Sequence, residues 1–187
     1  MTNFQFSKYK SLFLIILFVL AFTERVFFDF GPNFELVTTA LILSSFYLGK
    51  KTSFWSVFFI MLLSDLVIGN TNIFVFTWTG FLIPVLFINK TKSNSPFIKI
   101  LNGTLTGISV NLFFFLWTNF GVWLLSGMYP ETISGLLMSY INALPFLRYQ
   151  LTSTLIFVPF GFLLTELTLT LDKKYQLKSK LNHLFNI

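Results

Sequence analysis

The chain has no cysteine and one histidine, His183. Without cysteine there are no disulfides, no thiolate metal sites and no cysteine nucleophile. With a single histidine, neither a histidine-based metal site nor a Ser-His-Asp triad can be built. The sequence also lacks the G-x-x-x-x-G-K-[ST] motif, so it cannot bind ATP through a P-loop. We therefore expect no catalytic residues, no cofactor and no metal site, and a protein that is not an enzyme.

Charge is also scarce. Charged residues make up 11% of the chain and hydrophobic residues 55%, whereas roughly 25% of a soluble domain is charged. Mean hydropathy is +0.76. This composition predicts an all-α integral membrane protein with one domain of 187 residues, built as a six-helix transmembrane bundle. Apolar runs place the spans at about residues 11–28, 35–49, 53–68, 73–88, 97–125 and 146–171.

The basic residues favour one side of the membrane. Arg25 and Arg148 stand apart, and all the other basic residues fall before the first span, in alternate connections, or after the last span: Lys8, Lys10, Lys50, Lys51, Lys90, Lys92, Lys99, Lys173, Lys174, Lys178 and Lys180. By the positive-inside rule both termini are cytoplasmic, and residues 172–187 form a basic cytoplasmic tail. We expect a multi-pass protein of the bacterial inner membrane, with anionic lipid rather than nucleic acid beside these lysines.

Residues 132–144 are the exception to the simple alternation of spans. A full crossing there would place the C-terminal lysines outside, against the charge rule. The sequence therefore predicts a short outer-leaflet or re-entrant helix that ends at Pro145, with Gly135, Ser139 and Ala143 as a small-residue packing face. Gly103 and Gly107 have the same four-residue spacing, which allows close helix packing.

Two ionisable residues are the first candidates for a binding site. Asp65 is the only aspartate inside a predicted span, and an ionisable group there is a functional-site hypothesis by default. Arg148 begins the last predicted span, where it could pair with Asp65 or hold a substrate carboxylate or phosphate. The alternatives for Asp65 are a purely structural ion pair or a position close enough to the membrane interface to be hydrated. By contrast, Arg25, Asp29 and Glu35 flank the first outer turn, and we expect them to be solvated.

The fifth predicted span adds amide and indole side chains. Asn119 and Trp123 are four residues apart and share a helix face, with Asn111 on a nearby stripe. We expect Asn111 to join helices through hydrogen bonds and Asn119 to contact a ligand.

Three segments together carry a family resemblance: GPNFELVTTALILSSFYLG, LLSDLVIG and LFFFLWTNFGVWLLSGMYPETISGLLMSYINALPFLR. They resemble a family of small bacterial membrane proteins of unknown function that is associated with transport. That family is similar to the substrate-binding (S) components of energy-coupling factor transporters. The resemblance implies a bundle that captures a small solute outside and passes it inward, driven by separate ATPase and transmembrane coupling subunits.

The resemblance also implies the residues of the site. The family pattern falls on Pro130, Pro145 and six substrate-binding residues: Asn33, Asp65, Asn119, Trp123, Tyr129 and Arg148. The chain departs from the pattern in two places. Leu151-Thr152-Ser153 stands where the family has Gly-Asp, and the first helix lacks the small-xxx-small spacing by which S components meet their coupling subunit.

Three functional hypotheses follow. The first is binding and transport of a small solute in an outward-facing polar pocket. The second is a membrane scaffold or assembly protein whose polar residues serve helix packing, and the third is an intramembrane enzyme. A transporter requires an enclosed cavity lined by Asn119, Trp123 and Arg148, whereas a scaffold fills that space with side chains.

Overall fold

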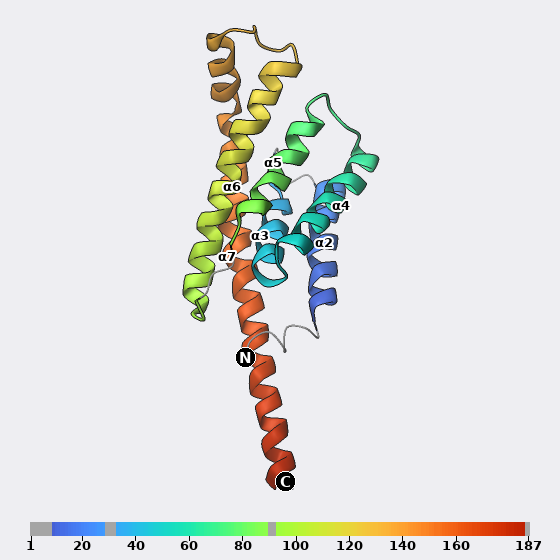
Figure 1. The fold of residues 1–187 in the computed structure, drawn as a ribbon, viewed down its shortest axis with the longest axis vertical. Helices are drawn as coiled ribbons and strands as arrows, with labels where there is room; N and C mark the ends of the chain where they lie inside the picture. The colour runs from blue at the N-terminus through green and yellow to red at the C-terminus, as the bar shows by residue number, and fades with distance from the viewer. Residues whose placement is uncertain (1–8, 29–32, 90–92, 186–187) are drawn as a thin grey trace.

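The computed structural model describes residues 9–28, 33–89 and 93–185, and over these ranges the chain is all-helical, with six helices and no strand. Figure 1 shows their arrangement, and the helices are α2 (Lys10–Phe27), α3 (Val37–Tyr47), α4 (Lys50–Ile68), α5 (Phe74–Phe87), α6 (Pro96–Leu125) and α7 (Ile133–Phe185). Three segments are long and apolar enough to cross a membrane: α4, α6 and Ile133–Tyr175 of α7. These segments indicate a membrane protein.

The short helix α3 lies at the centre of the bundle. It contacts every other helix, and all its residues from Val37 to Phe46 are buried. Its 11 residues give a length of about 16 Å, well below the ~30 Å of a bilayer core. The other helices therefore enclose it. At Gly49, where φ is +101°, the chain turns directly into α4.

Helices α6 and α7 form a long hairpin that extends past the ends of α4 and α5 in Figure 1. The two helices approach closely because glycine faces large side chains across the contact. A Cβ atom on Gly103 would overlap the ring of Phe162, and one on Gly107 would lie 2.8 Å from a methyl carbon of Thr154. The close packing predicted from the spacing of these two glycines is confirmed.

The prediction of a separate short helix ending at Pro145 is wrong. Helix α7 runs without a break from Ile133 to Phe185, with Pro145 and Pro159 inside it. Proline removes one backbone hydrogen bond, but packing on both sides can keep a membrane helix continuous. Here Ser139 and Ala143 are buried before Pro145, and Gln150 is buried after it. Residues 172–185 continue the helix, so this part of the predicted tail is helical.

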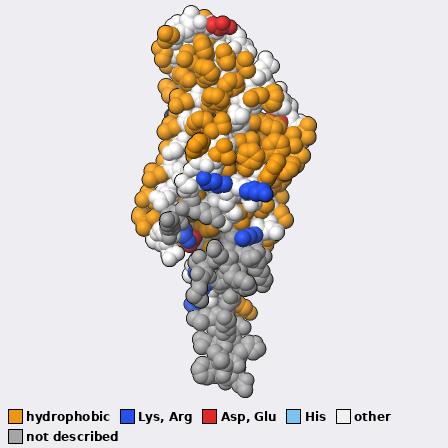
Figure 2. Space-filling model, in the orientation of Figure 1, with side chains coloured by type: hydrophobic (Ala, Val, Ile, Leu, Met, Phe, Trp, Pro, Cys, Tyr) orange, Lys and Arg blue, Asp and Glu red, His pale blue; other side chains and the backbone are white. Residues whose placement is uncertain are grey.

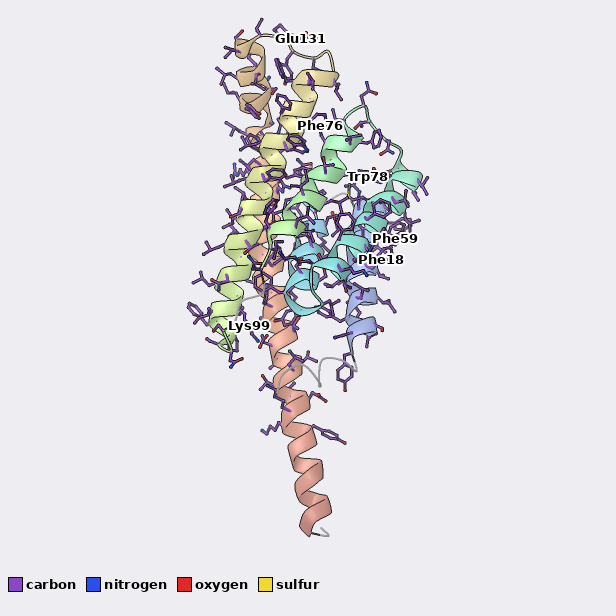
Figure 3. All side chains as sticks on the ribbon, in the orientation of Figure 1. Phe18, Phe59, Phe76, Trp78, Lys99 and Glu131 are labelled. Atoms are coloured by element: carbon purple, nitrogen blue, oxygen red, sulfur yellow. The ribbon has the colours of Figure 1, made fainter. Side chains whose placement is uncertain are left out.

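The surface of the bundle is apolar to an extent that water-soluble proteins avoid. Hydrophobic side chains cover most of the face in Figure 2, while lysine and arginine side chains gather toward the end from which α7 extends. Several large side chains are mostly exposed, among them Leu66 (74%), Phe87 (75%) and Ile133 (81%). Figure 3 places Lys99 at one end of the α6–α7 hairpin and Glu131 at the other. An apolar waist between polar ends is typical of a chain surrounded by lipid.

The contact between Gly103 and Phe162 predicts a specific loss of stability. Gly103→Ala should lower the unfolding free energy in mild detergent by about 1–3 kcal/mol, the usual effect of overpacking a core. Phe162 is fully buried, so its ring can yield only by displacing the side chains packed around it. Adding Phe162→Leu should restore part of the loss, as a thermal unfolding series of the four proteins would reveal. Strictly additive effects would contradict a direct contact.

Candidate functional site

A partly buried ion pair joins α2 to α4. Arg25 Nη2 lies 2.8 Å from Asp65 Oδ1, and Arg25 Nε donates to Ser64 Oγ at 2.8 Å. Asp65 Oδ2 accepts a hydrogen bond from Trp78 Nε1 on α5 at 2.7 Å. The Asp65 side chain is 6% exposed and that of Arg25 18%. Both carboxylate oxygens are therefore occupied by protein groups, and one aspartate ties three helices together.

Two glutamates make hydrogen bonds around the N-terminal end of α3. Glu24 Oε2 accepts a hydrogen bond from the backbone N–H of Leu36 at 3.1 Å. This contact places an acid at the N-terminal end of α3, where the helix dipole favours negative charge. Glu35 Oε1 accepts from Gln150 Nε2 on α7 at 3.2 Å. Both glutamates are buried, so the connection between α2 and α3 is anchored inside the bundle.

Asn111 connects three helices next to Gln150. Its Nδ2 donates to the backbone oxygen of Gln150 at 3.0 Å and to Thr154 Oγ1 at 2.7 Å. Its Oδ1 accepts from Thr38 Oγ1 on α3 at 3.1 Å. The residue is fully buried. The prediction that Asn111 serves helix–helix contact is confirmed.

Burial also acts on the protonation of Glu35. It lies in the connection before α3, outside the helices. Burial raises the pKa of Glu35 from 4.5 to about 7; Arg25 opposes the rise, Glu24 adds to it, and the Gln150 hydrogen bond opposes it. Glu35 can therefore exchange a proton near neutral pH.

Arg148 lies apart from this network, beside a cavity of about 620 Å³. No side-chain hydrogen bond or ion pair reaches its guanidinium from the residues that the structure describes. The cavity is lined by one face of α7 and by the residue after Asn33: Phe34, Leu144, Pro145, Arg148, Tyr149 and Thr152. Most of these residues are exposed, so the cavity is open at the surface and offers an unpaired cation beside aromatic and apolar side chains.

Two other predicted site residues make contacts at the far end of the α6–α7 hairpin. Asn119 Nδ2 donates to the backbone oxygen of Phe115 in its own helix at 2.8 Å. Trp123 Nε1 donates to the backbone oxygen of Pro130 at 3.0 Å. Neither residue lines the Arg148 cavity. The cavity that we expected Asn119, Trp123 and Arg148 to share is therefore not formed by these three residues together.

The remaining predicted residues lie near the connections. Tyr129 accepts a hydrogen bond on its hydroxyl from Asn142 Nδ2 at 3.2 Å. Asn33 is exposed, with φ of +60°, and directly precedes Phe34 in the cavity wall. Of the six predicted residues, Arg148 alone contributes its side chain to this cavity, with Asn33 next to it in the chain.

One expectation from the sequence is wrong, and one alternative that the sequence left open does not occur. Arg25 and Glu35 are not solvated, since Arg25 pairs with Asp65 and Glu35 is buried against Gln150. The optional pair between Asp65 and Arg148 does not form, because Arg25 takes that place. The third residue of this group, Asp29, lies outside the described residues.

A second charged cluster, which was not expected from the sequence, lies toward the opposite end of the bundle. Glu166 Oε1 on α7 accepts hydrogen bonds from Tyr47 on α3 at 2.7 Å and from Lys99 on α6 at 2.8 Å. An acid inside the last predicted span is a signal of the same kind as Asp65, and it could have identified Glu166. Within the described residues there is no group of three or more acids, cysteines or histidines that could hold a metal ion.

The sequence matches the model of a family of unknown function, DUF6580, over residues 5–177. The chain belongs to this family. Neither a search of curated proteins nor a search of solved structures found a match.

The Arg25–Asp65 pair predicts strong coupling between the two residues. Arg25→Gln or Asp65→Asn alone should lower the unfolding free energy by about 3–5 kcal/mol, because each leaves a buried charge unpaired. The double variant should be more stable than the sum of the two losses implies, as measured by unfolding in detergent. Asp65→Asn combined with Arg148→Gln should show no such coupling, since those two side chains are not paired.

The buried position of Glu35 predicts a stability that falls as pH rises. Because its folded pKa of about 7 exceeds the ordinary 4.5, the folded state holds the proton more tightly. The resulting stability is full below about pH 4.5 and is lost as pH rises to about 7, with a span of about 3 kcal/mol. Glu35→Gln should remove this dependence and be more stable than wild type at pH 8 in thermal unfolding. The exposed Glu131→Gln is the control, and an unchanged pH profile in Glu35→Gln would contradict the assignment.

Proposed function

We propose that this protein binds a small anionic solute in the Arg148 cavity and takes part in its transport across the membrane. In this role it would act like the substrate-binding component of an energy-coupling factor transporter. The solute carries a carboxylate or phosphate that meets the Arg148 guanidinium, because a planar guanidinium can bind either group through two parallel hydrogen bonds.

The observation that carries the proposal is an unpaired cation in a cavity of suitable size. The chain has two arginines, and the other one, Arg25, bonds to Asp65 and Ser64. Arg148 has no such protein partner among the described residues. Its cavity of about 620 Å³ falls within the range of small-molecule sites, roughly 300–1,000 Å³. Phe34 and Tyr149 would pack against the apolar part of the solute.

The proposed orientation follows from charge. If all six helices cross the membrane, both chain ends lie on the side of the clustered lysines, and the positive-inside rule makes that side the cytoplasm. The hydrogen bond of 3.4 Å between Tyr9, at the start of α2, and Asp172 on α7 agrees with this arrangement. The Arg148 cavity then lies toward the outer side of a bacterial inner membrane, where a solute enters.

The energy for transport would come from other chains. The sequence has no P-loop, so we propose that separate ATPase and transmembrane coupling subunits drive release of the solute inward. The protein itself acts as a binding and translocating subunit rather than an enzyme.

A second candidate function is a membrane scaffold, and the satisfied polar network favours it. Asp65 and Asn111 both use their side-chain oxygens for contacts between helices. In this alternative the polar residues hold the bundle in shape, and the Arg148 cavity holds lipid or water.

Loss of the Arg148 cation separates the two functions. Native mass spectrometry of protein purified in mild detergent should find a small anionic molecule on wild type and none on Arg148→Gln. Arg148→Lys should retain it more weakly, because an ammonium cannot form two parallel hydrogen bonds. Lys51→Gln, which also removes one exposed cation, should bind like wild type.

Stability separates a binding defect from misfolding in the same experiment. Because Arg148 is exposed and unpaired, Arg148→Gln should change the unfolding free energy by less than about 0.5 kcal/mol. Equal retention of a small molecule by wild type and Arg148→Gln would remove Arg148 from the site. A wild-type protein that carries no such molecule would favour the scaffold.

A further inference from the structure

A second cavity lies between α2 and α7, and its walls are almost wholly apolar. It has a volume of about 480 Å³. The α2 wall follows the helical spacing Tyr9, Leu12, Phe13, Ile16, Leu17 and Leu20, and the α7 wall runs from Phe157 to Leu169. Three threonines also line it. The hydroxyls of Thr165 and Thr168 donate to carbonyls in their own helix, whereas the buried hydroxyl of Thr39 on α3 has no hydrogen-bond partner among the described residues. We call this cavity the α2–α7 groove.

The length of the groove matches one leaflet of a bilayer. From Tyr9 to Leu20 the α2 wall spans 11 residue steps, or about 16 Å at the rise of an α-helix. Half of a bilayer core of ~30 Å is about 15 Å. The groove therefore has the length that an acyl chain of a single leaflet occupies.

One end of the groove carries positive charge. Lys10 follows Tyr9, and Lys173 lies one helical turn beyond Leu169 on the same stripe of α7. Lys174 is its neighbour, and all three lysines are exposed. One acid also stands here, Asp172, which accepts the Tyr9 hydroxyl hydrogen bond at 3.4 Å. Among the described residues named here, three cations against one anion favour a negatively charged group at this end.

We propose that the α2–α7 groove is a binding site for an anionic phospholipid. One acyl chain lies along the apolar walls, and the phosphate lies between Lys10 and Lys173. A neutral phospholipid fits the same walls but lacks net charge for the lysines, so the site selects for charge at the headgroup and for an alkyl chain in the groove. This proposal does not depend on the solute or on Arg148, which lines a different cavity.

The headgroup contact can be tested by competition between two lipids. Protein in mild detergent is mixed with equal amounts of phosphatidylglycerol and phosphatidylcholine that have identical acyl chains, and bound lipid is counted by native mass spectrometry. Wild type should retain phosphatidylglycerol preferentially. The variant with Lys10→Gln and Lys173→Gln should lose about tenfold of this preference. The matched control, Lys50→Gln with Lys51→Gln, removes the same charge at α4 and should leave the preference intact.

The acyl-chain contact has its own matched pair of variants. Leu164→Trp places an indole in the groove wall, whereas Leu163→Trp places one at a neighbouring exposed position outside the lining. Leu164→Trp should lose bound lipid of both kinds, and Leu163→Trp should retain it. Equal retention of the two lipids by wild type would overturn the proposal, and so would equal lipid loading of the two tryptophan variants. A dimer that dissociates only in Leu164→Trp would assign the groove to a second copy of the chain and would overturn it as well.

Discussion

Buried carboxylates in this bundle receive their hydrogen bonds from other helices, and this requirement sets how the helices meet. Asp65 joins α4 to α2 and α5, while Glu166 joins α7 to α3 and α6. Hydrocarbon offers neither donors nor acceptors, so each such group in a lipid-embedded chain needs a partner within the protein. The two clusters lie toward opposite ends of the bundle. Together they hold the helices in one register where apolar packing alone would allow sliding.

Helix α3 depends on this frame. It is too short to cross a bilayer by itself, and its ends would meet hydrocarbon if the neighbouring helices separated. At its N-terminal end, the backbone N–H of Leu36 donates a hydrogen bond to Glu24. At its C-terminal end, the hydroxyl of Tyr47 donates to Glu166. Because every residue of α3 except Tyr47 is buried, the other helices take their places around it. The long α6–α7 hairpin then extends beyond this short centre.

In the proposed function the two arginines have different roles: Arg25 holds helices together and Arg148 contacts the solute. Arg25 is held by a carboxylate and a hydroxyl, so its charge is neutralised at a partly buried position. Arg148 lies on α7 only two residues before Gln150, yet it faces a cavity while Gln150 is fully enclosed. Two steps along a helix rotate the direction of a side chain by about 200°. One short segment of α7 can therefore present a cation for a ligand and an amide to the core.

Apolar runs and turn residues in the sequence were enough to place the first five helices to within about three residues at each end. These features are local: a glycine such as Gly49 or a cluster such as Gly69-Asn70 ends a helix without help from distant residues. The two small-residue patterns, at Gly103 with Gly107 and at Gly135 with Ser139 and Ala143, also indicated correctly which faces pack closely.

The tertiary structure decided which polar groups meet. Asp65 pairs with Arg25, 40 positions away, rather than with Arg148. Glu35 faces Gln150 at a separation of 115 positions. Position in the membrane narrows the choice of partner but does not select among several groups at similar depth, because the selection depends on how the helices pack around α3. Pro145 is a further example. In the sequence alone this proline indicates the end of a helix, but packing on both sides of it maintains one continuous helix.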